Sequence, residues 1–286
     1  MSIGLLSVIS SSILYGLLPA AVRQLQNNGI PSGVIVFWTY FISLICYTLA
    51  AGLKEKSLKI RICKKDILFM FLAGAAGMGF TSFLLTSSYH HIPTGMATLI
   101  HFTYPVIITV FTSLFFHEPF TGSKLSGCIL SILGLLFVTN FTFSSVFTGI
   151  ALAFLSAVTY STYIMINDKA DFRSLPVCLK MVYLTFGSVL LFYLQTASQR
   201  QSVRIWGYWN ILLMAFIGLL SAFAFGLLTY GIKKIGSSRA AFAAMLEPVT
   251  SVVCGVIFWQ DNISLTGIAG IFFILCSMVI VNRESR

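Results

Sequence analysis

The chain has 286 residues, of which 57% are hydrophobic and only 9% are charged. A soluble domain cannot cover that much apolar surface with polar groups, so the composition excludes soluble proteins and indicates a polytopic membrane protein. The formal net charge of +10 does not indicate a nucleic-acid partner, because the basic residues gather in short segments on one side of the predicted spans.

Ten apolar runs follow one another along the chain, each of about 20 residues and so long enough to cross a bilayer as a helix. The first is predicted to be a retained span, because it has no basic segment before it and no convincing cleavage site after it. Alternating segments typical of a membrane β-barrel are absent. We therefore predict an all-α integral membrane protein with ten transmembrane helices. They cover residues 3–22, 33–52, 67–88, 95–116, 123–140, 147–166, 176–195, 209–231, 238–259 and 264–282.

The distribution of Lys and Arg predicts the orientation of these spans. With the N-terminus inside, cytoplasmic segments hold 15 of the 18 basic residues, including the cluster 54–65, and the opposite side holds Arg23, Arg200 and Arg204. This bias is a positive-inside signal, although Arg23 alone argues weakly against it. We predict a multi-pass protein of the cell membrane (inner or plasma membrane) with both termini cytoplasmic, whose basic loops set topology and contact lipid headgroups.

The second half of the chain resembles the first. Residues 85–139 align without a gap onto 228–282 at an offset of 143, with ten identical positions. Two leucine-rich helices match at several positions by chance, so the spacing of the rarer residues carries the argument. These pairs are Pro105 with Pro248, Glu118 with Asp261, and Gly127 with Gly270. A second patch, at an offset of 145, pairs Gly4, Ser11 and Tyr15 with Gly149, Ser156 and Tyr160.

The repeat predicts two five-helix units, 1–142 and 143–286, that lie in the bilayer in opposite orientations, because each unit has an odd number of spans. The charges support the inversion independently. Lys124 lies in a predicted cytoplasmic loop whose mate 260–263 has no Lys or Arg, and His90-His91 lies outside whereas its mate Lys233-Lys234 lies inside. Inverted repeats are typical of carriers with a site at their interface, so we expect a central cavity.

Several segments resemble the drug/metabolite transporter superfamily, and in particular its EamA-type carriers, over essentially the whole chain. They are the small-residue segment 74–79, the run from Tyr89 to Pro105, the triplet Leu246-Glu247-Pro248 and the segment Phe258-Trp259-Gln260-Asp261. The resemblance implies two EamA domains around a central cavity, with the fifth and tenth spans peripheral, and alternating access. Where many relatives carry an arginine early in the second span, this chain has Thr39. That departure means that no relative's substrate can be transferred.

Glu247 is the leading functional candidate, because it lies in the middle of a span with no other formal charge between Arg239 and Asp261. An ionised carboxylate in hydrocarbon is costly, so the side chain should face the interior or be protonated. We predict that it binds substrate and couples transport to protons; a structural, hydrogen-bonded acid beside Pro248 is the alternative. His101, the histidine deepest in a span, is either a packed imidazole or a substrate ligand, and a direct pairing with Glu247 stays open.

Aromatic and hydroxyl side chains in the spans complete the predicted substrate site, since a cavity uses them to hold a partly apolar solute. With His101 and Glu247 they are Tyr15, Trp38, Ser82, Thr86, Tyr104, Tyr160, Tyr163 and Tyr230. The alternative for each is a lipid-facing or packing role. We predict no metal site and no cofactor, because the cysteines lack metal-ligand spacing and His90-His91 has no further ligands.

The leading hypothesis is a secondary carrier, an exporter or exchanger, for a small metabolite such as an amino acid, nucleoside-like compound or amphipathic drug. No catalytic motif, nucleotide-binding loop or paired intramembrane carboxylate occurs, so we expect neither an enzyme nor a pump driven by ATP. An integral-membrane enzyme and a non-transporting channel or partner subunit are the alternatives. Besides the substrate and the lipid bilayer we expect no nucleic acid, and a monomer or homodimer. The Gly127-x-x-x-Ser131 motif favours packing within the chain.

Overall fold

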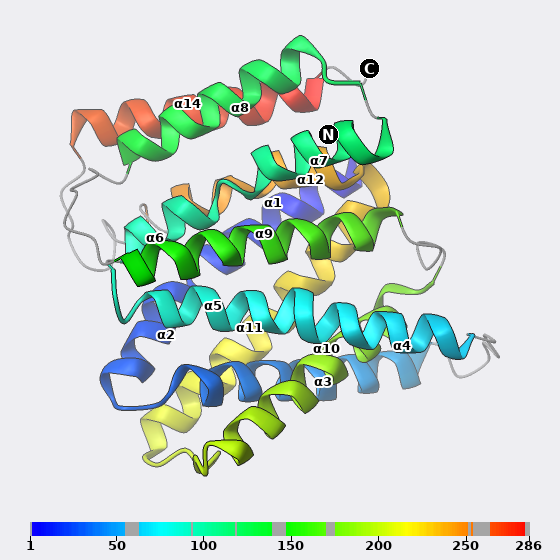
Figure 1. The fold of residues 1–286 in the computed structure, drawn as a ribbon, viewed down its shortest axis with the longest axis vertical. Coiled ribbons are helices and arrows are strands. Elements are labelled where there is room, and N and C mark those ends of the chain that lie inside the picture. The colour runs from blue at the N-terminus through cyan, green and yellow to red at the C-terminus, as the bar shows by residue number, and fades with distance from the viewer. Residues whose placement is uncertain are drawn as a thin grey trace.

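The structure is a computed structural model that describes residues 2–54, 63–92, 94–117, 119–138, 147–169, 175–250, 253 and 264–283. Every regular element in these ranges is a helix, which confirms the all-α fold class. The repeat pair Glu118 and Asp261 lies outside the described residues. Figure 1 shows the helices stacked side by side, with their long axes in roughly one direction.

The first half contains α1 (Ile3–Gly16), α2 (Leu18–Asn27), α3 (Ser32–Lys54), α4 (Lys64–Leu72), the π-helix η1 (Ala73–Gly79), α5 (Phe80–Ser88), α6 (Thr94–His101), α7 (Tyr104–Phe116) and α8 (Gly122–Val138). The second half contains α9 (Phe147–Lys169), α10 (Val177–Ser198), α11 (Tyr208–Ile235), α12 (Ser237–Ala244) and α14 (Leu265–Arg283). Residues 246–250 are also helical and follow α12 after a turn at Met245.

Seven helical segments of the described residues are long and apolar enough to cross a membrane. They are Ile3–Asn27, Ser32–Leu53, Lys64–Ser88, Phe147–Asp168, Val177–Ser198, Tyr208–Ile235 and Leu265–Arg283. Tyr104–Phe115 and Gly122–Phe137 are shorter apolar helices, and the ninth predicted span continues into residues outside the description. The chain is a multi-pass membrane protein, and the number of ten spans stays a prediction.

Prolines lie at three helix breaks, because proline lacks an N–H group and its ring clashes with the carbonyl four residues earlier. α1 gives way to α2 at Leu17, with Pro19 in the first turn of α2. The other two breaks correspond to each other in the repeat. α6 ends at His101, four residues before Pro105, and α12 ends at Ala244, four residues before Pro248. The offset of 143 between the copies therefore reappears in the helix ends.

Corresponding helices of the two halves run in opposite directions. In the pair α8 and α14, Gly127 packs against Val281 and Gly134 against Ile274, so the two helices are antiparallel. Figure 1 shows the same reversal between α1 and α9, and it shows α8 and α14 together at one edge of the molecule. The Gly127 contact also means that this small-residue motif packs within the chain.

Small residues bring η1 and α10 into close contact. A Cβ atom on Gly74 would lie 1.9 Å from the Leu184 carbonyl oxygen, and one on Gly187 would lie 2.0 Å from that of Phe71. The Ser188 hydroxyl donates a 2.8 Å hydrogen bond to the Gly74 carbonyl across this contact. The small-residue segment 74–79 thus places the third span directly against the seventh.

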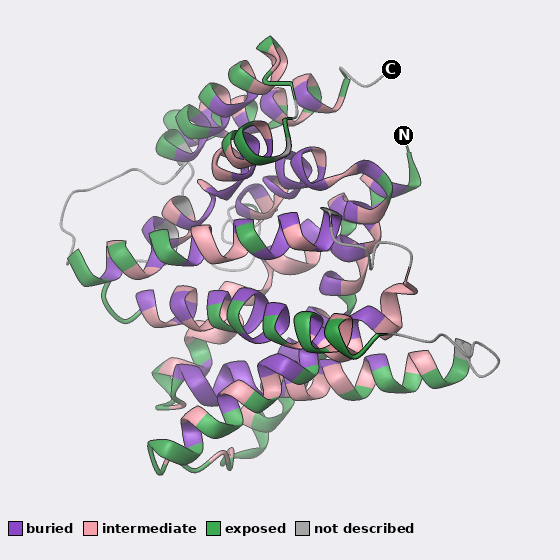
Figure 2. Cartoon of the chain, turned by 45° about the vertical axis from the view of Figure 1, so that its right-hand side comes forward, coloured by how far each residue is buried: buried purple, intermediate pink, exposed green. Residues whose placement is uncertain are grey.

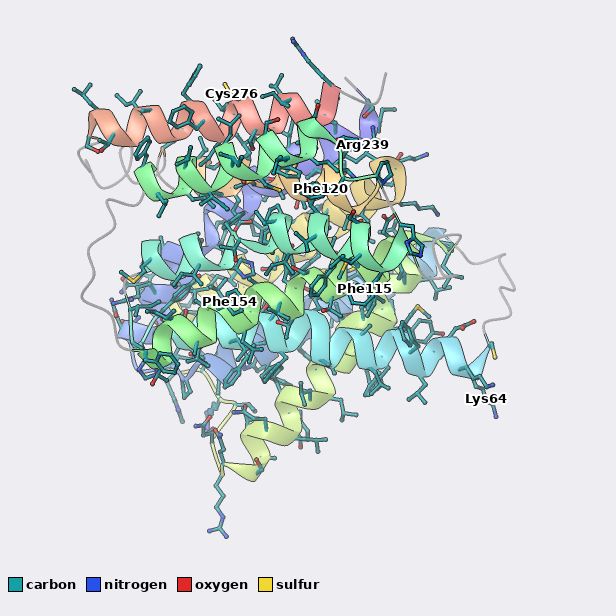
Figure 3. The ribbon with its side chains drawn as sticks, turned by 45° about the horizontal axis from the view of Figure 1, so that its top comes forward. Lys64, Phe115, Phe120, Phe154, Arg239 and Cys276 are labelled. Carbon is teal, nitrogen blue, oxygen red and sulfur yellow. The ribbon has the colours of Figure 1, made fainter. Side chains whose placement is uncertain are left out.

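The outward faces of the helices are apolar, as a lipid-facing surface requires. Phe115, Phe154, Phe223 and Phe272 are 70%, 52%, 69% and 63% exposed, and Figure 2 shows exposed residues on the outer sides of helices whose inner sides are buried. In Figure 3 the labelled Phe115 and Phe154 lie along the helix sides, whereas Lys64 lies at one end of the bundle. A polar functional site is therefore expected in the interior of the helix bundle.

Candidate functional site

A cavity of about 130 Å³ lies in the interior between helices of both halves. It is large compared with the roughly 10–15 Å³ that one water molecule needs, so it can hold water or a small solute. Side chains from α1, α2, α3, α5, α6, α9, α11 and the segment 246–250 line it, together with Tyr89 directly after α5. Its polar lining residues are Tyr15, Thr39, Tyr40, Thr81, Ser82, Thr86, Tyr89, His101, Tyr160, Ser221 and Glu247.

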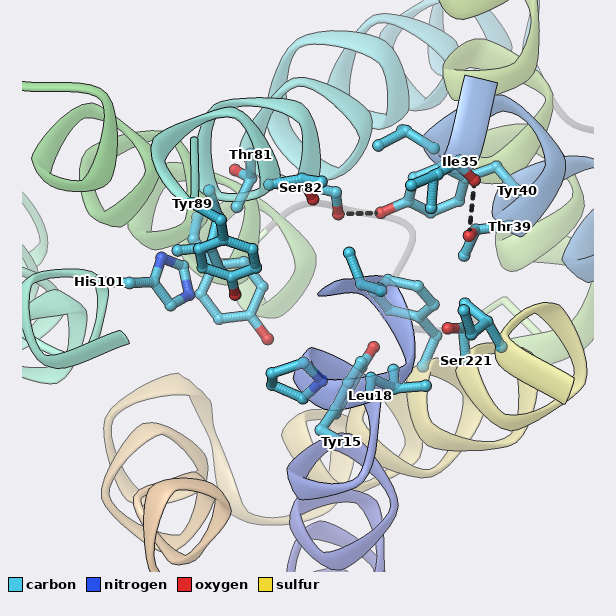
Figure 4. Close-up of a pocket in the computed structure, with 18 of the residues that line it drawn as sticks. Tyr15, Leu18, Ile35, Thr39, Tyr40, Thr81, Ser82, Tyr89, His101 and Ser221 are labelled. Carbon is cyan, nitrogen blue, oxygen red and sulfur yellow. Dashed lines mark hydrogen bonds between the residues drawn. The ribbon is translucent and has the colours of Figure 1, made fainter. Parts of the chain in front are cut away.

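The repeat mates Tyr15 and Tyr160 both line this cavity. Tyr15 lies on α1 just before the break at Leu17, and its ring packs edge-to-face against Phe225 at 5.3 Å. Its hydroxyl oxygen is buried and has no hydrogen-bond partner among the described residues. Figure 4 shows Tyr15 pointing into the space that also faces Ser82, Tyr89 and His101. A ligand or water molecule in the cavity would supply the missing partner.

His101 is the last residue of α6 and reaches the cavity beside the helix break. Its Nδ1 atom lies 2.9 Å from the hydroxyl oxygen of Ser156 on α9. Its ring packs against Tyr160 at 5.2 Å and against Tyr104 at 5.5 Å. The Ser156 contact fixes one ring nitrogen, so the imidazole is oriented by α9 and not by Glu247.

Glu247 lies in the helical segment after Met245 and lines the same cavity. It is half-buried, and its carboxylate makes no hydrogen bond or ion pair with the described part of the chain. It is near enough to Tyr89, Tyr104 and Tyr160 to interact with each electrostatically. Although His101 and Glu247 share the cavity, the structure does not join them directly.

Hydroxyl groups on α3 and α5 form the opposite wall. The Tyr40 hydroxyl lies 2.6 Å from the Ser82 hydroxyl and donates to the Met78 carbonyl at 3.0 Å. Thr39 donates to the Ile35 carbonyl one turn earlier, at 2.8 Å, and Figure 4 shows both contacts at the edge of the cavity. These side chains use their hydrogen-bonding capacity within the protein, in contrast to Tyr15 and Glu247.

Four predicted site residues lie away from the lining of this cavity. Trp38 donates its Nε1–H to the Val203 carbonyl at 2.6 Å, and Tyr104 is buried in the aromatic cluster around His101. Tyr163 lines a second, very small cavity with Asn167 and Lys180. The ring of Tyr230 faces the Lys234 ammonium group, whose nitrogen is 5.6 Å from the ring centroid. The roles of all ten residues stay predictions.

A polar cluster lies at the end of α9. Asn167, Asp168 and Lys180 are buried, and the Lys180 ammonium group donates to the Asn167 carbonyl at 3.3 Å. Asp168 accepts a 2.8 Å hydrogen bond from the backbone N–H of Ser237, the first residue of α12. A carboxylate at this position stabilises the start of the helix. Lys180, which the sequence analysis counted among the cytoplasmic charges, is thus part of the packed interior.

Comparison with protein families decides the class. The sequence model of the EamA-like transporter family matches the chain twice, at residues 2–140 and 147–283. The chain belongs to the EamA-like transporter family. It is therefore a membrane transporter, and the family resemblance inferred from the sequence is confirmed.

Curated relatives of this EamA-like protein carry transporter names. An uncharacterized transporter of Archaeoglobus fulgidus is 27% identical over 78% of this chain and 80% of its own length. The uncharacterized transporter YoaV of Bacillus subtilis is 23% identical over 96% of this chain and 94% of its own. The uncharacterized inner membrane transporter YhbE of Escherichia coli K12 is 22% identical over 92% and 82%. One crystal structure shares the fold, with a TM-score of 0.81 and 17% identity, over 100% of this chain and 99% of that one.

Sequence reasoning missed several residues that line the cavity of this EamA-like protein, among them Tyr40, Tyr89, Ser221 and Phe225. Helical spacing could have indicated some of them. Tyr89 lies seven residues after Ser82, and so on one helical face with it. Ser221 and Phe225 are four residues apart on α11, but nothing in their types separates them from lipid-facing positions. Within the described residues no group of three or more His, Cys, Asp or Glu side chains could hold a metal ion.

Proposed function

We propose that this EamA-like protein is a secondary active carrier that exports or exchanges a small metabolite by alternating access, with proton coupling through Glu247. The observation that carries the proposal is the Glu247 carboxylate, which has no protein partner in the described residues and faces a cavity lined by both halves. An acid that lines a cavity without a fixed partner can take up either a proton or a substrate group, and exchange of the two is coupled transport.

The arrangement of the two halves supports alternating access. Corresponding helices run in opposite directions, and both fourth spans are broken beside the cavity or its acid. In carriers built from inverted repeats, one half moves against the other around a fixed site near the middle of the bilayer. A cavity lined by both halves supports a site of this kind.

We place the protein in the cell membrane (inner or plasma membrane) with both termini cytoplasmic. The 15-to-3 distribution of basic residues supports this orientation. The start of α1, the end of α14 and the start of α4 all lie at one end of the bundle in Figures 1 and 2, as this topology requires. YhbE, one of the relatives, is named as an inner membrane transporter.

Reconstitution into proteoliposomes tests the coupling. A thermal-shift panel of amino acids, nucleosides, polyamines, drugs and S-adenosylmethionine first identifies a ligand, because a ligand raises the unfolding temperature by mass action. Uptake of that ligand is then measured with and without a pH gradient. We expect Glu247→Gln to abolish gradient-driven uptake, and Glu247→Asp to retain part of it.

The matched control removes a different acid. Asp66 lies in the first turn of α4, away from the cavity, so Asp66→Asn should transport at the wild-type rate. Circular dichroism and size-exclusion profiles establish that each variant is folded. Unchanged gradient-driven uptake by a folded Glu247→Gln variant would rule out Glu247 as the coupling site. If the wild-type protein transported no member of the panel, the proposed carrier function would be wrong.

A further inference from the structure

The cavity lining contains one acid, one histidine and several hydroxyl groups, but no Lys or Arg among the described residues. Glu247 is its one acidic lining residue, and no Lys or Arg lines it in the described part of the chain. Arg23 follows the lining residue Val22, but its guanidinium donates to the Tyr89 carbonyl at 2.9 Å and does not line the cavity. A negative group on a ligand would therefore be buried without the fixed positive charge of a Lys or Arg, which is unfavourable.

Several polar groups of the cavity make no hydrogen bond within the described residues. Among them are the Glu247 carboxylate, the Tyr15 hydroxyl and the hydroxyl of its repeat mate Tyr160. Each can accept a hydrogen bond, and a protonated primary amine has three N–H donors. One ammonium group therefore has enough donors for all three, and Glu247 would balance its charge.

The remaining walls suit an apolar or aromatic body. The rings of Tyr40, Tyr89 and Phe225 line the cavity together with aliphatic side chains such as Leu18 and Ile35. Aromatic faces also attract cations, and protein sites for ammonium ligands are often built from several rings around one acid or none. The lining thus combines apolar and aromatic side chains and uncharged hydroxyl groups with a single acid.

From this lining we infer that the substrate is a compact organic amine, with one protonated amino group, an apolar or aromatic body and no carboxylate. The inference rests on the proposed carrier function and names its substrate class. It excludes free amino acids, whose carboxylate would meet no Lys or Arg among the described lining residues. It also excludes organic anions.

Four compounds with one phenyl body and different polar groups test the inference on the purified full-length protein. They are 2-phenylethylamine, phenylalanine, 2-phenylethanol and 3-phenylpropanoate. We expect 2-phenylethylamine alone to raise the apparent unfolding temperature, by roughly 3–5 °C at saturation. A rise with phenylalanine or 3-phenylpropanoate that equals or exceeds the rise with the amine overturns the inference, as does the absence of any rise with the amine.

Variants separate the ammonium site from a general apolar effect. Glu247→Gln should remove the rise with 2-phenylethylamine, and Tyr15→Phe or Tyr160→Phe should weaken amine binding by about 2–10-fold, the effect of one lost hydrogen bond. Tyr193→Phe is the matched control, because Tyr193 is 52% exposed on α10 and does not line the cavity. Equal weakening by Tyr193→Phe would contradict the assignment.

Transport assays distinguish this inference from the proposed function. If another compound class is taken up along a pH gradient while 2-phenylethylamine neither binds nor competes, the amine assignment is wrong and the carrier stands. If 2-phenylethylamine binds through Glu247 but neither it nor any other compound is transported, the amine site stands and the carrier function is wrong.

Discussion

The two halves of this transporter have corresponding helix breaks in their fourth spans but differ in their first and third. The fourth spans break at corresponding positions, after His101 and after Ala244. In contrast, the first span is broken at Leu17 whereas its counterpart α9 is continuous, and the third span contains η1 whereas α11 is a continuous α-helix. Prolines account for the difference in the first spans, because Pro19 has Ile164 as its mate. The position of a helix break therefore depends more on the local sequence than on the repeat relation between the halves.

At the shared helix break the two halves carry different side chains, so the two halves contribute different functional groups to the cavity. At an offset of 143, His101 corresponds to Ala244 and Tyr104 to Glu247. The first half contributes His101 to the cavity and the second contributes Glu247, whereas Tyr104 lies in the aromatic cluster. The backbone is thus duplicated, but the acid is present once, in the second half.

Moving the carboxylate from position 247 to the corresponding position 104 should have the largest effect on transport. In the double variant Tyr104→Glu with Glu247→Tyr, the carboxylate is transferred from a cavity-lining position to one that does not line the cavity. We expect gradient-driven uptake in proteoliposomes to fall to the level of protein-free liposomes. Size-exclusion profiles check that the variant is folded, and recovery of uptake would show that the two breaks are functionally equivalent.

Opposite orientation of the halves can be tested by labelling with a membrane-impermeant maleimide. Cys63 is exposed before α4 in the first half, and Ser202 is exposed in the corresponding loop of the second half, between α10 and α11. We expect Cys63 to react only in opened cells. In a Cys63→Ser background, Ser202→Cys should react in intact cells. Labelling of both positions from the same side would contradict the inverted topology.

Much of this fold can be predicted from two sequence features, the length of the apolar runs and the positions of helix-breaking prolines. Apolar length gives the spans, and the prolines at positions 105 and 248 give the breaks of the fourth spans. The offset of 145 pairs Tyr15 with Tyr160 in the predicted site, and both line the cavity. These features are visible because each depends on local sequence alone.

The rest of the site depends on which face of each helix meets which neighbour, and no local pattern specifies this. Trp38 and Tyr40 are two residues apart, yet only Tyr40 lines the cavity, because they lie on different faces of α3. Asp168 meets the start of α12 across 69 residues of sequence. The π-helix η1 also could not be predicted, although its small residues permit the close approach of α10.

The close approach of η1 and α10 should give the largest difference in stability between matched variants. In Gly74→Ala the new Cβ would lie 1.9 Å from the Leu184 carbonyl oxygen, so backbone must move. We expect a loss of about 1–3 kcal/mol in the free energy of unfolding, measured as a lower apparent unfolding temperature in detergent. Gly52→Ala is the control, because nothing lies within 4 Å of a Cβ there, and it should be neutral or stabilising by up to about 1 kcal/mol. Equal stability of the two variants would show that α10 is free to move away from η1.

The smallest expected effects come from a pair of mates with opposite charge, Arg23 and Asp168, at an offset of 145. Each anchors the end of the first span of its half: Arg23 to the Tyr89 carbonyl, and Asp168 to the Ser237 N–H. Asp168 is buried whereas Arg23 is half-buried, so the Asp168 hydrogen bond is less exposed to competition from water. We expect Asp168→Ala to cost about 1–2 kcal/mol and Arg23→Ala less than about 1 kcal/mol in thermal unfolding. A larger loss in Arg23→Ala would mean that the anchor of the first half is the stronger one, which reverses the order inferred from burial.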